Sequence, residues 1–362
     1  MTRSLANLVS LTFYVYGLPI FSYDHLFVYE FMFDLLAAVQ QRRVVIENNH
    51  GEKLSGILHE TGSKQLVIVC HGFQSSKERI PMVNLASALE KEGISAFRFD
   101  FAGNGESEGL FQYGNYRREA EDLRAVVQYF RGENRVISAV IGHSKGSSKG
   151  VNIHNDNFLF EIEILLIDEE MFSHLKWNHL DYGSLEKRAN LIQDYFAGGN
   201  VVLLYASKYN DVHTVVNISG RFNLEKGMEG RLGKDFLLRL QQHGYIDVFN
   251  RKGKFEYRVT EESLKDRLTT DTCEACLSIQ QDCRVLTVHG SMDKIVPVED
   301  ALEFVKFIPN HKLHIIKGAN HEYTSHQGEL TSVVLDFLRE SFNVEKDMPK
   351  LLLKDHSFRS RL

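Results

Sequence analysis

Residues 136–146 read VISAVIGHSKG, a short apolar run followed at once by the pattern G-x-S-x-G around Ser144. The apolar run predicts a buried strand, and G-x-S-x-G directly after a strand is typical of a nucleophile elbow, in which the serine stands on a sharp strand-to-helix turn. The two glycines fit such a turn because a β-carbon at either place would collide with the adjacent strand and helix. A glycine-rich turn with an incidental serine fits these five residues equally well, so the rest of the chain must decide.

The segments around this stretch alternate between predicted strands and helices. Short apolar runs predict strands at residues 65–70, 94–99, 215–218, 284–288 and 312–316, and apolar residues at helical spacing predict helices at residues 81–91, 116–130, 201–207, 298–307 and 329–342. A further strand pair is predicted at residues 43–46 and 54–58. This alternation predicts an α/β fold, with a mostly parallel central sheet and helices on both faces.

Three motifs, HGF, DFAGNGES and GHSKG, come directly after three successive predicted strands. In this order they resemble the α/β-hydrolase fold, and the resemblance covers residues 41–343. In that fold the catalytic residues come in the chain order serine, acid, histidine, and the last two follow late strands. The matching residues here are Ser144, Asp293 and His321.

The resemblance implies a role for each of these residues. Ser144 would attack the substrate, His321 would take its proton as general base, and Asp293 would hold the imidazole in the productive tautomer. The developing oxyanion needs preorganised donors, which in this family are two backbone N–H groups. The matching positions here are Phe73 and Lys145.

Other polar residues near these motifs have alternative interpretations. His326 competes with His321 for the role of base, but the family pattern places the base directly after the last strand, where His321 stands. Four residues are interpreted as packing, loop or helix-start residues: His71, His143, Asp100 and Asp300.

The bulk composition restricts the classes of function. With 362 residues, a net charge of −6, 43% hydrophobic and 25% charged residues, the sequence is ordinary for a soluble globular protein and gives no reason to expect a nucleic-acid partner. The four cysteines do not suggest a disulfide framework, and Cys273 and Cys276, with Cys283 nearby, lack a suitable fourth ligand for zinc. We therefore expect neither a metal nor an organic cofactor.

The sequence divides into a hydrolase domain at residues 41–343 and two flanking segments. Within the domain, residues 221–281 are predicted to form a cap, whose hairpin turning at residues 250–253 resembles the small inserted domains of cinnamoyl and feruloyl esterases and of monoacylglycerol-lipase-like hydrolases. Residues 344–362 are interpreted as a C-terminal tail. Residues 1–40 form an extension rich in aromatic residues, with an apolar run too short to span a bilayer and no clear signal-cleavage site. An extension packed on the body, a membrane-surface anchor and a targeting segment all stay open.

Residues 147–198 depart from the family pattern, in which a buried helix begins directly after the elbow. Without them the chain would join Gly146 to Gly199 and give an unbroken elbow and helix, whereas the actual sequence SSKGVNIHNDN is a poor helix start. Either this insert loops out and the helix from Gly199 docks late, or it derives from sequence usually absent from the mature message, such as a retained intron. We favour the second interpretation because removal of the insert restores local consistency.

The chain ends in Ser360, Arg361 and Leu362, which differ from the peroxisomal address S-K-L only by arginine for lysine. A peroxisomal import receptor is therefore a candidate partner, and a cytoplasmic location is the alternative. The predicted function is hydrolysis of small-molecule carboxylic esters through an acyl-enzyme. Two alternatives remain: acyl transfer, or amide or thioester cleavage, with the same triad, and a non-catalytic binding protein whose elbow the insert disrupts.

Overall fold

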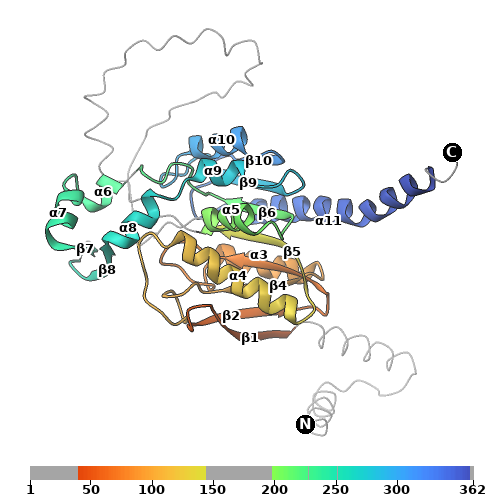
Figure 1. The fold of residues 1–362 in the computed structure, drawn as a ribbon, viewed down its shortest axis with the longest axis horizontal. Coiled ribbons are helices and arrows are strands. Elements are labelled where there is room, and N and C mark those ends of the chain that lie inside the picture. The colour runs from red at the N-terminus through yellow and green to blue at the C-terminus, as the bar shows by residue number, and fades with distance from the viewer. Residues whose placement is uncertain (1–39, 144–197, 227, 251, 359–362) are drawn as a thin grey trace, which may run out of the picture.

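The computed structural model describes residues 40–143, 198–226, 228–250 and 252–358, with the backbone alone from residue 344 onward (Figure 1). Eight strands of the described chain form one sheet in the order β1-β2-β4-β3-β5-β6-β9-β10. Their bounds are β1 Gln40–Glu47, β2 Lys53–Glu60, β3 Gln65–Cys70, β4 Ser95–Phe99, β5 Val136–His143, β6 Thr214–Ile218, β9 Arg284–Gly290 and β10 His311–Ile316. β2 pairs antiparallel with β1 and β4, and every other pairing in the sheet is parallel.

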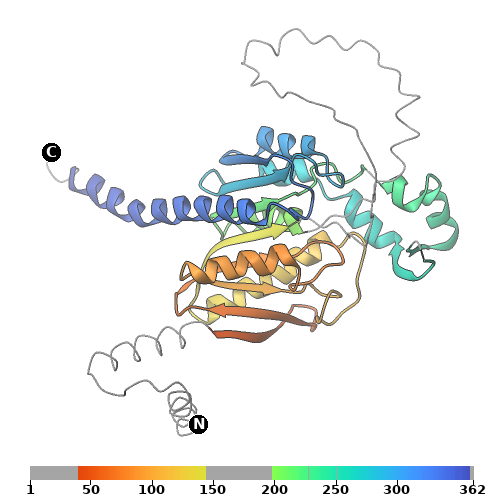
Figure 2. The same ribbon diagram turned by 180° about the vertical axis from the view of Figure 1, so that it is seen from behind.

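Helices cover both faces of this sheet. α4 (Tyr116–Gly132), α5 (Gly198–Tyr209) and α10 (Val298–Phe307) pack on one face, which is in front in Figure 1. α3 (Ile80–Lys91) and α11 (Gln327–Phe358) pack on the other, which is in front in Figure 2. Side chains alternate along each strand, so Leu66 and Ile68 of β3 join the first core while Val67 and Val69 join the second. None of the helices in the described part of the chain combines the length and apolarity needed to cross a membrane.

Between β6 and β9 the chain forms a smaller group of elements, all but the last of which lie at one end of the sheet in Figure 1. The last, α9 (Thr272–Leu277), packs against α5 and α10. We call residues 221–281 the cap segment. Its elements are α6 Met228–Leu232, α7 Phe236–His243, β7 Tyr245–Phe249, β8 Phe255–Thr260, α8 Glu261–Leu268 and α9 Thr272–Leu277. β7 and β8 form the predicted antiparallel hairpin.

The predicted fold class is confirmed, and α10 has the predicted bounds. The predicted C-terminal end of the last helix is wrong: α11 continues to Phe358, through most of the predicted tail. The added stretch contains helix-favouring residues such as Glu345, Lys346 and the leucines 351–353, and it is helical although Pro349 lies within it. The extension at residues 1–39 and nearly all of the insert lie outside the described residues, so the two interpretations of the insert's origin stay predictions.

Candidate active site

The predicted site residues in the described chain lie at one edge of the sheet. β3, β5, β6, β9 and β10 are parallel, so their carboxyl ends meet at the same edge. Phe73 comes after β3, while His143 is the last residue of β5. Asp293 follows β9 and His321 follows β10. Strands distant in the sequence thus bring these residues together.

The carboxylate of Asp293 is buried and hydrogen-bonded through both oxygens. Its Oδ2 accepts a hydrogen bond from Nδ1 of His321 at 2.6 Å, and its Oδ1 accepts the backbone N–H groups of Ile295 and Val296 at 2.8 and 2.9 Å. Burial alone would raise the pKa of Asp293, but His321 and His289 outweigh it and hold the pKa well below its usual range. The carboxylate is therefore ionised at neutral pH.

The pKa of His321 depends on this carboxylate. Burial would lower the pKa of His321, but the charge and hydrogen bond of Asp293 outweigh burial and raise the pKa above 6.5. The other ring nitrogen, Nε2, is buried and has no hydrogen-bond partner among the described residues. An imidazole that is held by a hydrogen bond at Nδ1 and has no partner among the described residues at Nε2 has the arrangement that a general base needs.

The end of β5 contacts this histidine. His143 Nε2 donates to the backbone oxygen of His321 at 3.1 Å, and the two rings are 5.6 Å apart between centroids. Burial, together with the nearby His321, lowers the pKa of His143 to about 3, so the ring is neutral. The next residues, Ser144 and Lys145, lie outside the described chain. His143 ties the end of β5 to the loop of His321, which agrees with its interpretation as an ordering residue.

The loop after β3 is fastened to the loop after β4 by a buried ion pair. Asp100 accepts hydrogen bonds from the backbone N–H and from Nζ of Lys77, each at 2.6 Å, and the Lys77 side chain is only 1% exposed. Burial would lower the pKa of Lys77, but Asp100 and Glu106 raise it. His71 adds a second link, since its Nε2 accepts the backbone N–H of Phe101. Asp100 is thus more than a charged loop residue, because it fixes the loop that carries Phe73.

α5 begins directly against the end of β5. A β-carbon on Gly142 would overlap the carbonyl oxygen of Gly198, and one on Gly198 would overlap the carbonyl oxygens of His143 and His71. The helix N-terminus is also tied to the loop after β6, because the Asn200 side chain exchanges two hydrogen bonds with the backbone of Arg221. Gly198 therefore packs against the end of β5, where the last glycine of the predicted G-x-S-x-G turn is expected to pack.

The ring of Phe73 contacts the cap segment. Phe111, Tyr113 and Tyr257 pack edge-on against it with centroids 4.7, 5.8 and 5.5 Å away. Tyr257 belongs to the hairpin strand β8, and its hydroxyl accepts a hydrogen bond from Arg231 of α6. The cap segment therefore reaches the predicted oxyanion residue directly.

Comparison with known proteins agrees with this architecture. The profile of the serine aminopeptidase S33 family matches residues 61–157. YDL057W, an uncharacterized protein of Saccharomyces cerevisiae, is 23% identical over 304 residues, which cover 80% of this chain and 78% of the yeast protein.

Several solved structures are similar in fold to this chain over most of its length. Est1E from Butyrivibrio proteoclasticus, solved with ferulic acid bound, has a TM-score of 0.57 at 19% identity and covers 83% of this chain and 99% of its own. The α/β hydrolase GrgF from Penicillium sp. sh18 has a TM-score of 0.60 at 18% identity, with 84% and 99% covered. The Pyrococcus furiosus esterase Pf2001 has a TM-score of 0.54 at 20% identity, with 83% and 91% covered. This chain has the α/β-hydrolase fold.

The sequence could not reveal how the loop that carries Phe73 is held in place. Lys77 was not singled out, because a lysine in a polar loop is usually exposed and its partner Asp100 stands 23 residues away. The motif DFAGNGES, which begins at Asp100, was the only sequence signal that this acidic residue has a role in the loop. His326 was the alternative candidate for the general base. In the described structure it makes no hydrogen bond to Asp293, whose Oδ2 is bound by His321.

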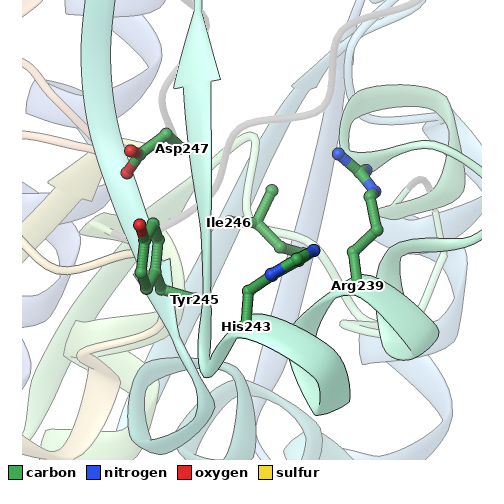
Figure 3. Close-up of a pocket in the computed structure, with 5 residues that line it drawn as sticks. All are labelled: Arg239, His243, Tyr245, Ile246 and Asp247. Carbon is green, nitrogen blue, oxygen red and sulfur yellow. The ribbon is translucent and has the colours of Figure 1, made fainter.

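Other features of the described chain lie away from these residues. A surface hollow of about 230 Å³ is lined by Arg239 and His243 of α7 and by Tyr245, Ile246 and Asp247 of β7 (Figure 3). It includes none of the predicted site residues. In the described ranges, no group of three or more histidine, cysteine or acidic side chains is arranged to hold a metal. The four cysteines are free, and burial raises the pKa of Cys283 to about 12.

Proposed function

We propose that this α/β-hydrolase is a serine esterase that cleaves carboxylic esters through an acyl-enzyme on Ser144. The observation that supports this most strongly is the buried pair of His321 and Asp293, 2.6 Å apart, beside the strand end that precedes Ser144. Nε2 of His321 has no hydrogen-bond partner in the described chain, as a base awaiting the serine hydroxyl would.

In the proposed reaction, Ser144 Oγ gives its proton to His321 Nε2 as it attacks the ester carbonyl carbon, and the carbonyl oxygen becomes an oxyanion. The backbone N–H groups of Phe73 and Lys145 stabilise that charge. The ester C–O bond then breaks, and the alcohol leaves with the proton from His321. A water molecule repeats the sequence on the acyl group, which releases the acid and restores Ser144.

The test combines active-site labelling with turnover. We expect a fluorophosphonate probe to label the full chain and p-nitrophenyl butyrate to be hydrolysed, with both lost in Ser144→Ala and His321→Gln. His326→Gln is the matched control and is expected to keep both activities. Methyl ferulate belongs in the substrate panel because Est1E was solved with ferulic acid bound. Labelling that survives Ser144→Ala, or that is lost equally in His326→Gln, would contradict the proposal.

Two other functions are distinguished by the same assay. Acyl transfer or thioester cleavage uses the same residues, and product analysis with added alcohol or with acyl thioesters separates it from ester hydrolysis. The insert directly after the elbow favours a second candidate, a non-catalytic binding protein. A folded chain that neither labels nor turns over any ester would support that candidate.

The tail residues Ser360, Arg361 and Leu362 lie outside the described chain. We propose that they serve as a peroxisomal import signal, with the cytoplasm as the alternative location. A fluorescent reporter carrying the last ten residues should collect in peroxisomes. A reporter that stays diffuse would contradict this.

A further inference from the structure

The hairpin β7–β8 buries one face and exposes the other. Ile246, Val248, Tyr257 and Val259 are at most 8% exposed, and Tyr257 packs against Phe73 of the body. Figure 3 shows Tyr245 and Asp247 on the opposite side of β7 from Ile246, which points toward α7. The hairpin is therefore anchored through its inner face, and its outer face and tip are open.

The tip carries two exposed phenylalanines. Phe249 and Phe255 pair across the strands, with ring centroids 6.0 Å apart, and are 56% and 50% exposed. The cap segment as a whole is rich in exposed apolar side chains. It contains seven of the fourteen large hydrophobic side chains that are exposed in the described residues. Of these, Phe249 and Phe255 are shown to be adjacent, and such a pair of exposed rings is a candidate contact surface.

The turn between them presents lysines. The Asn250 side-chain oxygen accepts the backbone N–H groups of Lys252 and Lys254 at 2.9 and 3.0 Å, and Gly253 adopts the left-handed conformation that the turn requires, with φ of 71°. Both lysines are exposed, and no acidic side chain in the described ranges forms an ion pair with either. By contrast, Lys306 is paired with Glu303. The tip therefore carries two exposed lysines without an ion pair among the described residues, close in sequence to two exposed aromatic rings.

We propose that this hairpin tip, with Phe249, Lys252, Lys254 and Phe255, docks on an anionic phospholipid surface. Aromatic rings enter the headgroup region of a bilayer while neighbouring lysines pair with anionic headgroups, so the two features of the tip suit the same partner. A second copy of the chain fits less well, because tip-to-tip contact would bring the lysines of both copies together. The whole chain carries a net charge of −6, so the attraction must be local to the tip.

The proposal does not depend on the esterase assignment, since docking can be measured in Ser144→Ala as well as in the native chain. If both proposals hold, docking brings the cap segment, and through Tyr257 the loop of Phe73, to a surface that contains lipid esters.

The experiment is vesicle sedimentation with the full chain. We expect binding to phosphatidylcholine vesicles containing phosphatidylserine, weak binding to phosphatidylcholine alone, and release by high salt. Replacing Lys252 and Lys254 by Ser should weaken binding about fivefold per lysine. Phe249→Ala with Phe255→Ala should weaken it by about tenfold or more together.

Matched controls change similar residues elsewhere. Leu302→Ala with Val305→Ala removes two side chains of α10 that are 48% and 46% exposed, and Lys64→Ser removes an exposed lysine far along the chain from the tip. These variants should bind as the native chain does. The proposal is overturned if the native chain does not bind phosphatidylserine vesicles, or if tip and control variants bind equally. It is also overturned if size-exclusion chromatography shows a dimer that the phenylalanine variant converts to a monomer, since the tip would then be a self-association surface.

Discussion

Asp293 receives its orientation from the backbone. Two main-chain N–H groups hold Oδ1, which leaves Oδ2 facing His321. The position of the imidazole therefore depends on the loop after β9 and not on the rotamer of the histidine alone. The same carboxylate raises the pKa of His321 against the effect of burial, so one residue sets both the tautomer and the basicity of the proposed base.

This arrangement predicts the pH profile of ester hydrolysis. A general base must be neutral, so kcat/KM should rise with pH through the raised pKa of His321, with the acid limb centred above 6.5. Asp293→Asn removes the negative charge and favours the wrong tautomer, so kcat should fall roughly 10⁴-fold. Any residual acid limb should move to lower pH. Stopped assays from pH 5 to 9 on both proteins measure this, and an unmoved acid limb would contradict it.

The buried ion pair of Lys77 and Asp100 predicts a stability effect. Lys77→Met leaves the Asp100 carboxylate buried without its counter-charge, which should cost about 3–5 kcal/mol of unfolding free energy. Asp100→Asn in the Lys77→Met background should recover part of this loss. Urea unfolding gives the values, and Lys91→Met, at an exposed lysine of α3, is the control. A loss no larger than that of the control would mean that the pair adds nothing.

At the scale of secondary-structure elements, the contact between α5 and β5 leaves no room for a side chain at Gly198. Gly198→Ala would push a methyl group into the backbone oxygens of two strand ends, which cannot move away, so we expect a loss of about 1–3 kcal/mol and slower fluorophosphonate labelling. Gly132→Ala, at the end of α4 with open space around it, should instead stabilise the chain by about 0.5–1 kcal/mol. Equal thermal shifts for the two variants would contradict this packing argument.

The elements also show what the sequence could predict. In β3 the run Leu66–Cys70 is apolar throughout because both faces of the strand are buried, so a central strand of this kind could be predicted. The cap helices α6 to α9 span only five to eight residues, too few for a helical period to emerge, and they were missed. Partners of the site residues were missed for another reason, because pairs such as Lys77 with Asp100 depend on three-dimensional proximity that no local pattern records.

At the scale of the whole molecule, β5 ends at His143 and α5 begins at Gly198, and these two residues are in contact. The segment between them therefore begins and ends at the same place. β5, α5 and the loop of Asn200 contact one another directly, through Gly142, Gly198 and the two hydrogen bonds between Asn200 and Arg221. Joining Lys145 to Gly198 would restore the reading GHSKGGNVV that the sequence suggested, whichever origin the insert has.

Deletion of residues 146–197 should therefore preserve the fold. Shortening a loop of this length between two fixed ends lowers the entropy cost of closing it by about 2–3 kcal/mol, so the melting temperature should stay level or rise. The joined elbow would also place the Lys145 amide directly at the N-terminus of α5, where the helix dipole favours an oxyanion, so fluorophosphonate labelling should become faster. Gly198→Ala in the deleted chain should cancel that gain. A deleted chain that aggregates, or that labels more slowly than the full chain, would show that the segment is needed for the site.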